Sequence, residues 1–521
     1  MKIKIVAVSV TVVIILLAIT CTGDKASNET VNETPKETVS VSWPGYQPIP
    51  AGFDYPANTT TLNAALSAVN DTTLRHHAWS LFAGMMQPAK NNVGWPVWYT
   101  WPNSVEALRI KDIFCQGDTG VHNLGAKEFH SLSLIQRNRL HVASKAILDT
   151  LHTPNYPMPQ PVIDQFENLN VFTNASHTAI IPGKHFLFNG DIMIPTESLS
   201  EGAYNWINNN GFYNKHVMDS LYSAKKGSGL EAPSNYVVTK HMYWPVLKGQ
   251  LNLVPVWYPG DYNPAYTGYA GYEMWKHFVA VDPGGLTQQI ITPLAYLYNV
   301  YNFDNTKQIG PVMAKPGNYS RHSINEFYYH QITQADWDSF DASDKAILMA
   351  SSYWAYNKPI GVGDYLVTIA SHINTKELYS WTMQSAWWTD QPNVGPYSKN
   401  RPALPNAQGP WQHYNLVDAY GLPSAPGGSE LPMASNPYIE LVIHPMQTNC
   451  NNCHIRAGYP EIGVTGDSTQ AGYQNKLCYD MLRKLYDSSS CFKNYMRTDF
   501  QWIIPDYTHP LLLCDEKGKK K

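Results

Sequence analysis

Charged side chains are scarce in this sequence of 521 residues, and several familiar catalytic motifs do not occur in it. Aspartate, glutamate, lysine and arginine make up 15% of the residues, against about 25% in an average soluble domain. The formal net charge is −4 at pH 7, so the chain lacks the basic footprint of nucleic-acid-binding proteins. G-x-S-x-G, H-E-x-x-H, the phosphate-binding loop and G-x-G-x-x-G are missing. The enzyme classes that depend on these motifs are excluded, whereas an enzyme whose cofactor performs the chemistry is not.

Aromatic residues, prolines and glycines are abundant instead. Aromatic residues make up 12% of the chain, and there are 37 prolines and 34 glycines. Disordered chains have few aromatic residues and high net charge, so this composition indicates a folded, loop-rich protein. Helix-like patterns at 61–88 and 335–356 and strand-like runs at 235–258 and 363–373 occur without a regular alternation. We therefore predict an α+β fold with a large mixed, loop-rich body.

The first residues have the pattern of an export signal. Two lysines precede a fifteen-residue apolar run, residues 5–19, and Cys21 follows it closely. A permanent membrane-spanning helix needs about 20 apolar residues, so the run is short for one. Its ending, LLAITC, resembles a bacterial lipoprotein signal in which Cys21 becomes the lipidated first residue. A plain cleaved signal and an uncleaved anchor stay open as alternatives, because Thr20 stands where glycine or alanine is usual.

This start predicts an exported protein, either periplasmic or anchored in the outer membrane through a lipid at Cys21. Residues 1–21 would be the signal. Residues 22–42 are polar and lack aromatic side chains, which is typical of a flexible tether. A tether directly after a lipidated cysteine is what surface anchoring requires.

One short motif carries specific chemistry. Cys450, Cys453 and His454 form C-x-x-C-H within TNCNNCHIRAGYP. In a c-type haem site, two thiols add across the haem vinyl groups and the adjacent histidine supplies the proximal iron ligand. One helical turn presents both sulfurs to the porphyrin edge, and the next residue places its imidazole over the iron. Covalent haem c, held by Cys450 and Cys453 with His454 as the metal ligand, is the favoured interpretation.

Zinc and a disulfide are the alternatives. Structural zinc uses four ligands, usually from two C-x-x-C-like pairs, whereas Cys478 and Cys491 are not paired at that spacing. A disulfide between Cys450 and Cys453 is compatible with an exported protein. Export also favours haem, because c-type haem is attached outside the bacterial cytoplasm.

The C-x-x-C-H resembles the attachment motif of cytochromes c. Longer stretches are similar to large exported bacterial proteins with one C-terminal haem motif, called cytochrome c family proteins. They are RHHAWSLFAGMMQP, WPVWYTW, YLVTIASHINTKELYSW and IELVIHPMQTNCNNCH. This resemblance implies one haem per chain and redox chemistry, but no particular substrate.

The sixth iron ligand would separate the possible roles. A methionine sulfur favours electron transfer, whereas an open position permits small-molecule chemistry. Met496 and Met481 are the candidates by position. Met446, His444 and His509 are less favoured candidates. His372, at the end of an apolar strand, is a further candidate for binding, although a hydrogen-bonded structural histidine is the commoner case.

Four other cysteines could form disulfides in an exported chain, and four thiols permit three pairings. They are Cys115, Cys478, Cys491 and Cys514. Cys478 with Cys491 would close a loop of about 14 residues, worth roughly 3 kcal/mol in the chain-entropy model. The two remaining cysteines, Cys115 and Cys514, would then form the second disulfide.

The sequence thus predicts two folded parts, a large body at 43–395 and a smaller, mainly helical c-type haem region at 436–521. A Pro/Gly-rich linker or covering loop at 396–435 would lie between them. The predicted function is that of an exported mono-haem c-type cytochrome that exchanges electrons with a redox partner protein or a small-molecule donor or acceptor. A haem-containing oxidoreductase with a substrate pocket in the body is the first alternative. A surface protein that binds glycan or polymer through its aromatic clusters is the second.

Overall fold

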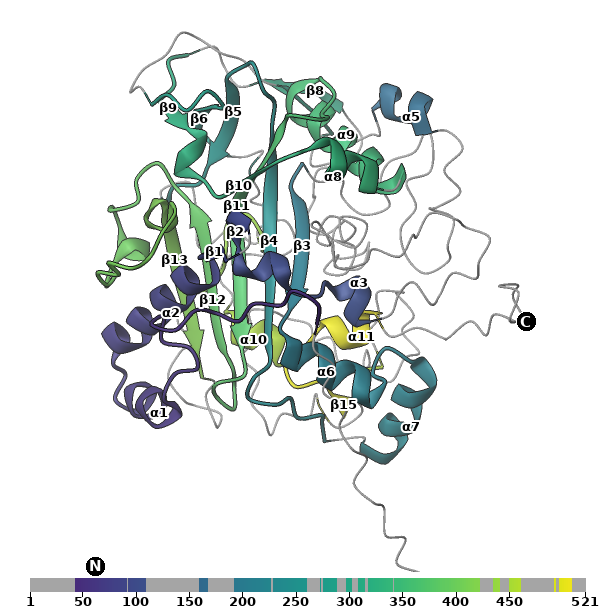
Figure 1. Ribbon diagram of the computed structural model, residues 1–521, viewed down its shortest axis with the longest axis vertical. Helices are drawn as coiled ribbons and strands as arrows, with labels where there is room; N and C mark the ends of the chain where they lie inside the picture. The colour runs from purple at the N-terminus through teal and green to yellow at the C-terminus, as the bar shows by residue number, and fades with distance from the viewer. Residues whose placement is uncertain are drawn as a thin grey trace, which may run out of the picture. The chain divides into compact units, whose positions relative to one another are not determined.

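The computed structural model describes fifteen stretches of the chain, all within the compact unit Ser40–Lys521 (Figure 1). They are residues 43–90, 92–108, 159–166, 192–225, 228–259, 272, 275–287, 297–301, 308–313, 317–340, 342–421, 434–440, 449–460, 492 and 496–507. The predicted signal, the tether and Cys21 lie outside these residues, as do the four cysteines considered for disulfides. No helix among the described residues is long and apolar enough to cross a membrane.

A six-stranded antiparallel sheet forms the centre of the fold, in the order β13-β12-β11-β4-β3, with β10 also pairing with β11. Its strands are β3 (Ile194–Leu199), β4 (Val237–Val246), β10 (Tyr329–Gln331), β11 (Tyr365–Thr375), β12 (Thr382–Trp388) and β13 (Tyr414–Tyr420). The strand predicted at 363–373 is observed as β11, whose β-branched residues suit a sheet buried on both sides. The paired β4 and β11 form the long middle of the sheet (Figure 1).

The helical pattern at 61–88 forms two helices, α1 (Thr59–Ser67) and α2 (Asp71–Met85). Val69 has a positive φ of 52°, which interrupts the helix, and the Asn70 side chain then accepts a hydrogen bond from Thr73 N to begin α2. The second predicted helix, at 335–356, is likewise divided into α8 (Gln334–Ser339) and α9 (Ala342–Tyr356). Phe340 is extended and ends α8. Apolar spacing alone did not reveal either break.

The remaining elements surround the main sheet. Three small sheets pair β1 (Pro88–Ala89) with β2 (Asn92–Pro96), β7 (Leu297–Tyr301) with β8 (Gln308–Met313), and β5 (Asn252–Val256) with β6 (His277–Asp282) and β9 (Arg321–Ser323). A fourth pairs β14 (Gly458–Tyr459) with β15 (Met496–Arg497). The other helices are η1 (Val97–Thr100), α3 (Ser104–Ala107), α5 (Gln160–Phe166), α6 (Glu201–Asn210), α7 (Lys215–Lys225), η7 (Ile324–Glu326), η8 (Pro396–Ser398), η9 (Trp411–His413), α10 (Cys450–His454) and α11 (Ile503–Tyr507).

The two faces of the main sheet carry different layers. Directly paired residues point to the same face, so the strand register assigns every side chain. One face carries Asp418, which binds Arg75 of α2, and His241, which stacks on Trp98 of η1. The opposite face carries a row of polar residues, namely Glu197, Lys240, His372 and Ser385. Asn436 Nδ2 donates to Ser385 Oγ at 2.8 Å, which places the segment 434–440 over this second face.

The mixed α+β fold class is confirmed. Within the segment 396–435, Tyr414–Tyr420 forms β13 at the edge of the main sheet. Buried residues on both sides of this segment, such as Trp244 and Ile455, belong to one hydrophobic core. The described part of 436–521 contains α10 and α11 and the pair β14–β15.

Candidate functional site

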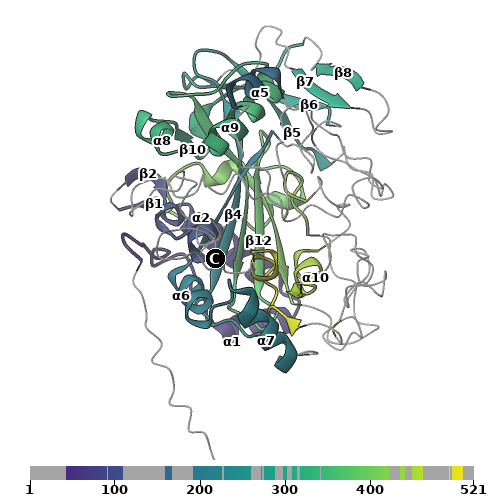
Figure 2. The ribbon, with the colours of Figure 1, turned by 90° about the vertical axis from the view of Figure 1, so that its right-hand side faces the viewer.

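The C-x-x-C-H motif forms the short helix α10, beside the strands of the main sheet (Figure 2). The Asn449 side chain accepts hydrogen bonds from the backbone N–H groups of Asn451 and Asn452, so it caps the first turn. Positions i, i+3 and i+4 of a helix share a face, which brings Cys450, Cys453 and His454 to one side. Asn451 and Asn452 are buried, with 0% and 3% exposure. The structure therefore brings the three predicted site residues together.

The orientation of His454 is set by a residue far along the chain. Its Nδ1 lies 2.8 Å from the carbonyl oxygen of Phe500. A carbonyl oxygen can only accept, so Nδ1 carries the proton and Nε2 presents its lone pair. Burial lowers the pKa of His454 to about 4, and the neighbouring His372 and Lys240 act in the same direction. The imidazole is therefore neutral at pH 7, with a defined tautomer.

Phe500 is itself held by an anchored turn. Asp499 and Phe500 have positive φ angles of 51° and 66°, a conformation that side chains adopt only when their surroundings demand it. Hydrogen bonds to the Asp499 carboxylate hold the turn in this conformation. The carboxylate accepts from Lys376 Nζ at 2.9 Å, from Trp381 Nε1 at 3.2 Å and from Ala232 N at 2.7 Å. These contacts fix the turn to the body of the protein, and with it the carbonyl that orients His454.

The two cysteines of α10 are reduced thiols and form no disulfide with each other. The Cys450 thiol donates a hydrogen bond to the carbonyl oxygen of Ala434 at 3.3 Å. Burial raises the pKa of Cys450 well above its usual value, and the nearby Glu440 carboxylate raises it further. The thiol of Cys450 is therefore neutral. Among the residues that the structure describes, no group of three or more His, Cys, Asp or Glu side chains is arranged to hold a metal ion.

Ionisable groups of the sheet lie on the same side as α10. His372 Nε2 lies 2.8 Å from Glu440 Oε1, and the next strand contributes Lys240, whose Nζ is 3.8 Å from Glu197. His372 sits in the interior of β11 and pairs with Lys240 and Ser385, rather than at a strand end as the sequence indicated. Glu440 raises the pKa of both His454 and Cys450, whereas His372 and Lys240 lower the pKa of His454.

The structure describes one of the candidates for a sixth ligand. Met496 lies in β15, fully buried in the hydrophobic core and opposite Tyr459 of β14. Met481, Met446, His444 and His509 lie outside the described residues. Sequence reasoning missed Asp499 and Phe500, because nothing local connects them with a histidine 46 positions earlier.

Comparison with known proteins adds no relative. No family model matches the chain, and neither the curated proteins nor the solved structures contain a match.

Proposed function

We propose that this protein is an exported mono-haem c-type cytochrome that accepts and releases single electrons. Cys450 and Cys453 would hold the haem through thioether bonds, and His454 would be its proximal iron ligand. The sequence motif and the export-type N-terminus support the assignment. A redox partner protein or a small-molecule electron donor or acceptor would complete the reaction.

The hydrogen bond from His454 Nδ1 to the Phe500 carbonyl oxygen carries the proposal. A metal-ligating histidine typically donates its second ring N–H to a carbonyl or carboxylate, which fixes the tautomer and makes the ligating nitrogen more basic. Here Nε2 is left with its lone pair on the face of α10 that also carries both cysteines. An imidazole prepared in this way fits an iron ligand at the position that the motif predicts.

The position of Cys450 suits an uncharged sulfur. Burial and the nearby Glu440 carboxylate raise the pKa of Cys450 and favour the neutral thiol. A thioether sulfur is neutral as well, so attachment to haem keeps this position uncharged.

The chain's own residues would perform three tasks in the electron carrier. Cys450 and Cys453 fix the position of the group, His454 ligates it, and the turn at Asp499 and Phe500 holds the imidazole. When bound, the haem supplies a one-electron couple whose potential depends on the axial ligands and on burial.

The test is the visible absorption spectrum of protein that has been matured with c-haem machinery, recorded before and after denaturation. Soret and α bands that stay with the denatured chain would demonstrate covalent attachment. Cys450→Ser combined with Cys453→Ser should abolish the retained bands, whereas the matched control Cys115→Ser should keep them. Absence of covalent haem in the wild-type protein would refute the proposal.

The same sample distinguishes the carrier from an oxidoreductase. A band near 695 nm is expected of methionine ligation to oxidised iron and supports electron transfer. A high-spin spectrum that changes when CO is added would favour the oxidoreductase, with the charged groups His372 and Glu440 near the motif as its first candidates for substrate contacts.

A further inference from the structure

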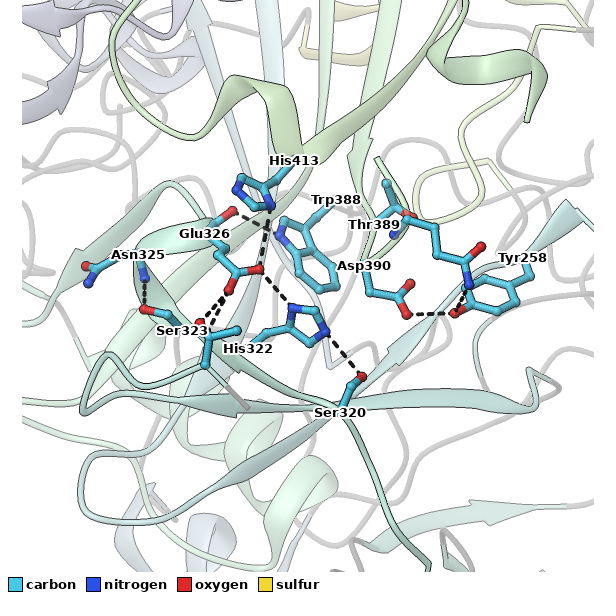
Figure 3. A network of polar contacts seen from close by, with 12 residues as sticks. Tyr258, Ser320, His322, Ser323, Asn325, Glu326, Trp388, Thr389, Asp390 and His413 are labelled. Carbon is cyan, nitrogen blue, oxygen red and sulfur yellow. Dashed lines mark hydrogen bonds and ion pairs between the residues drawn. The ribbon is translucent and has the colours of Figure 1, made fainter. Parts of the chain in front are cut away.

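A network of polar side chains lies between the small sheet of β5, β6 and β9 and the end of β12 (Figure 3). Figure 3 shows His322 hydrogen-bonded to Ser320 through one ring nitrogen and to Glu326 through the other. His322 Nε2 lies 3.2 Å from Ser320 Oγ, and His322 Nδ1 lies 2.8 Å from Glu326 Oε2. A nucleophile, a base and a carboxylate that orients the base are thus in contact, each through the atom that acyl-transfer chemistry requires.

Local structure explains this arrangement. β9 begins at Arg321, and residues two positions apart on a strand share a side, so Ser320 and His322 point the same way. Arg321 points to the other side, where it binds Asp282. The chain then turns into η7, whose last residue is Glu326, and this turn brings the carboxylate back to His322.

Glu326 is fixed on both of its oxygens. Oε1 accepts from Thr287 Oγ1 at 2.8 Å and from Ser323 N at 3.2 Å, whereas Oε2 binds His322 Nδ1 at 2.8 Å and lies 3.5 Å from His413 Nδ1. Burial would raise the pKa of Glu326, but the hydrogen bonds from His322 and Thr287 outweigh burial, so the pKa lies below its usual value. The carboxylate is therefore ionised at neutral pH and can only accept hydrogen bonds.

An ionised Glu326 decides which nitrogen of the neutral His322 imidazole carries the proton. Nδ1 donates to Oε2, and in this tautomer Nε2 can accept the hydroxyl proton of Ser320. Trp388 supports the geometry, since its ring packs edge-on against His322 and its Nε1 donates to the Glu326 carbonyl oxygen at 3.0 Å. Ser320 and His322 are both partly exposed to solvent rather than enclosed in the core.

We propose that Ser320, His322 and Glu326 form an acyl-transfer site that hydrolyses small carboxylic esters. Ser320 Oγ is the nucleophile, His322 is the general base, and Glu326 is the positioning residue. The site is separate from the C-x-x-C-H motif and does not depend on the proposed haem.

The reaction is balanced with water as the only co-reactant. Ser320 Oγ bonds to the ester carbonyl carbon while its proton passes to His322 Nε2, and the carbonyl π electrons move onto oxygen. When the carbonyl reforms, the bond to the alcohol oxygen breaks and that oxygen takes the proton from His322. Water then repeats the attack on the acyl-Ser320 ester with His322 as base, which releases the acid and restores the serine.

Two measurements on the full chain test the site. The first is hydrolysis of 4-methylumbelliferyl acetate, read as fluorescence, and the second is labelling by a fluorophosphonate, mapped by peptide mass spectrometry. Wild-type protein should hydrolyse the ester and carry one label on Ser320. Ser320→Ala should lose the label and at least about 10³-fold in kcat/KM. The matched control Ser398→Ala, a half-buried serine of η8, should behave like wild type.

Glu326→Gln tests the positioning role. It should reduce kcat by roughly 10²-fold with little change in KM. The base loses its orientation, whereas the residues that contact the substrate are unchanged. A fold defect alone would instead reduce labelling and substrate binding together. The proposal is overturned if wild-type protein neither hydrolyses the ester nor reacts at Ser320, or if Ser320→Ala retains both properties.

Discussion

Replacement of Asp499 by alanine tests the anchored turn behind His454. The Asp499 and Lys376 side chains are only 8% and 9% exposed, so the variant removes one partner of a buried ion pair. Such a removal costs about 3–5 kcal/mol, because the other charge stays buried. Trp381 Nε1 and Ala232 N lose their acceptor as well.

Two features of the structure place the expected loss within that range. Lys376 Nζ keeps a hydrogen bond to the Tyr379 carbonyl oxygen at 3.0 Å and lies 5.6 Å from the Trp381 ring centroid, which reduces the penalty. Alanine tolerates the positive φ of position 499 less well than aspartate, which increases it. We expect Asp499→Ala to lower the free energy of unfolding by about 4 kcal/mol. Asp499→Asn keeps an acceptor and the backbone preference and should cost only about 1–2 kcal/mol.

Guanidinium unfolding followed by tryptophan fluorescence measures both variants. Asp338→Ala is the matched control, since Asp338 is exposed and its carboxylate accepts only from Gln334 in α8, so a loss below about 0.5 kcal/mol is expected. If Asp499→Ala loses less than about 1 kcal/mol, or no more than the control, the anchoring argument is refuted.

With haem attached, Asp499→Ala has a second expected effect. A displaced Phe500 carbonyl no longer accepts from His454 Nδ1, and the imidazole becomes a weaker donor to iron. Oxidised iron is then less stabilised, so the reduction potential should rise. An unchanged potential in a variant with the expected stability loss would show that another group orients His454.

Three further predictions concern the scaffold. Gly84→Ala places a Cβ 2.5 Å from Phe53 Cβ. Thermal unfolding should therefore show a free energy of unfolding that is lower by about 1–2 kcal/mol, despite the better helix propensity of alanine. A gain in stability would contradict the close packing at this position. Burial, which outweighs the attraction of Arg75, raises the pKa of Asp418 from 3.8 to about 6. The folded protein therefore keeps a proton that the unfolded chain releases, and this group's stabilisation of up to about 3 kcal/mol is lost as the pH rises from about 4 to 6. The free energy of unfolding of Asp418→Asn, measured over this pH range, should not show this decrease. A pH dependence equal to that of the wild-type protein would contradict the raised pKa of Asp418. Asn449→Ala removes the cap of α10 and should cost about 1 kcal/mol, measured by denaturant unfolding; an unchanged midpoint would show that the cap is dispensable.

Local sequence patterns determined the parts of this protein whose interactions are close along the chain. The spacing of Cys450, Cys453 and His454 was sufficient to place them on one side of a short helix, since the positions i, i+3 and i+4 always meet. A run rich in β-branched residues likewise revealed β11, and the mixture of helix-like and strand-like patterns predicted the α+β class. Breaks such as that at Val69 escaped detection, because a positive φ in an exposed valine leaves no apolar signature.

Tertiary structure alone decided which residues from distant parts of the chain contact these elements. Phe500 meets His454 across 46 positions, and Glu440 meets His372 across the face of the sheet, because packing of the whole chain brings them there. A segment rich in proline and glycine supplied β13, since strand pairing depends on an available sheet edge as well as on composition. Ser320, His322 and Glu326 lie within seven positions and meet through the local turn from β9 into η7, so tertiary structure decided only what surrounds them, such as Thr287 and Trp388. The sequence specified the chemical groups, whereas contacts between groups far apart in the chain depended on long-range packing that no local pattern encodes.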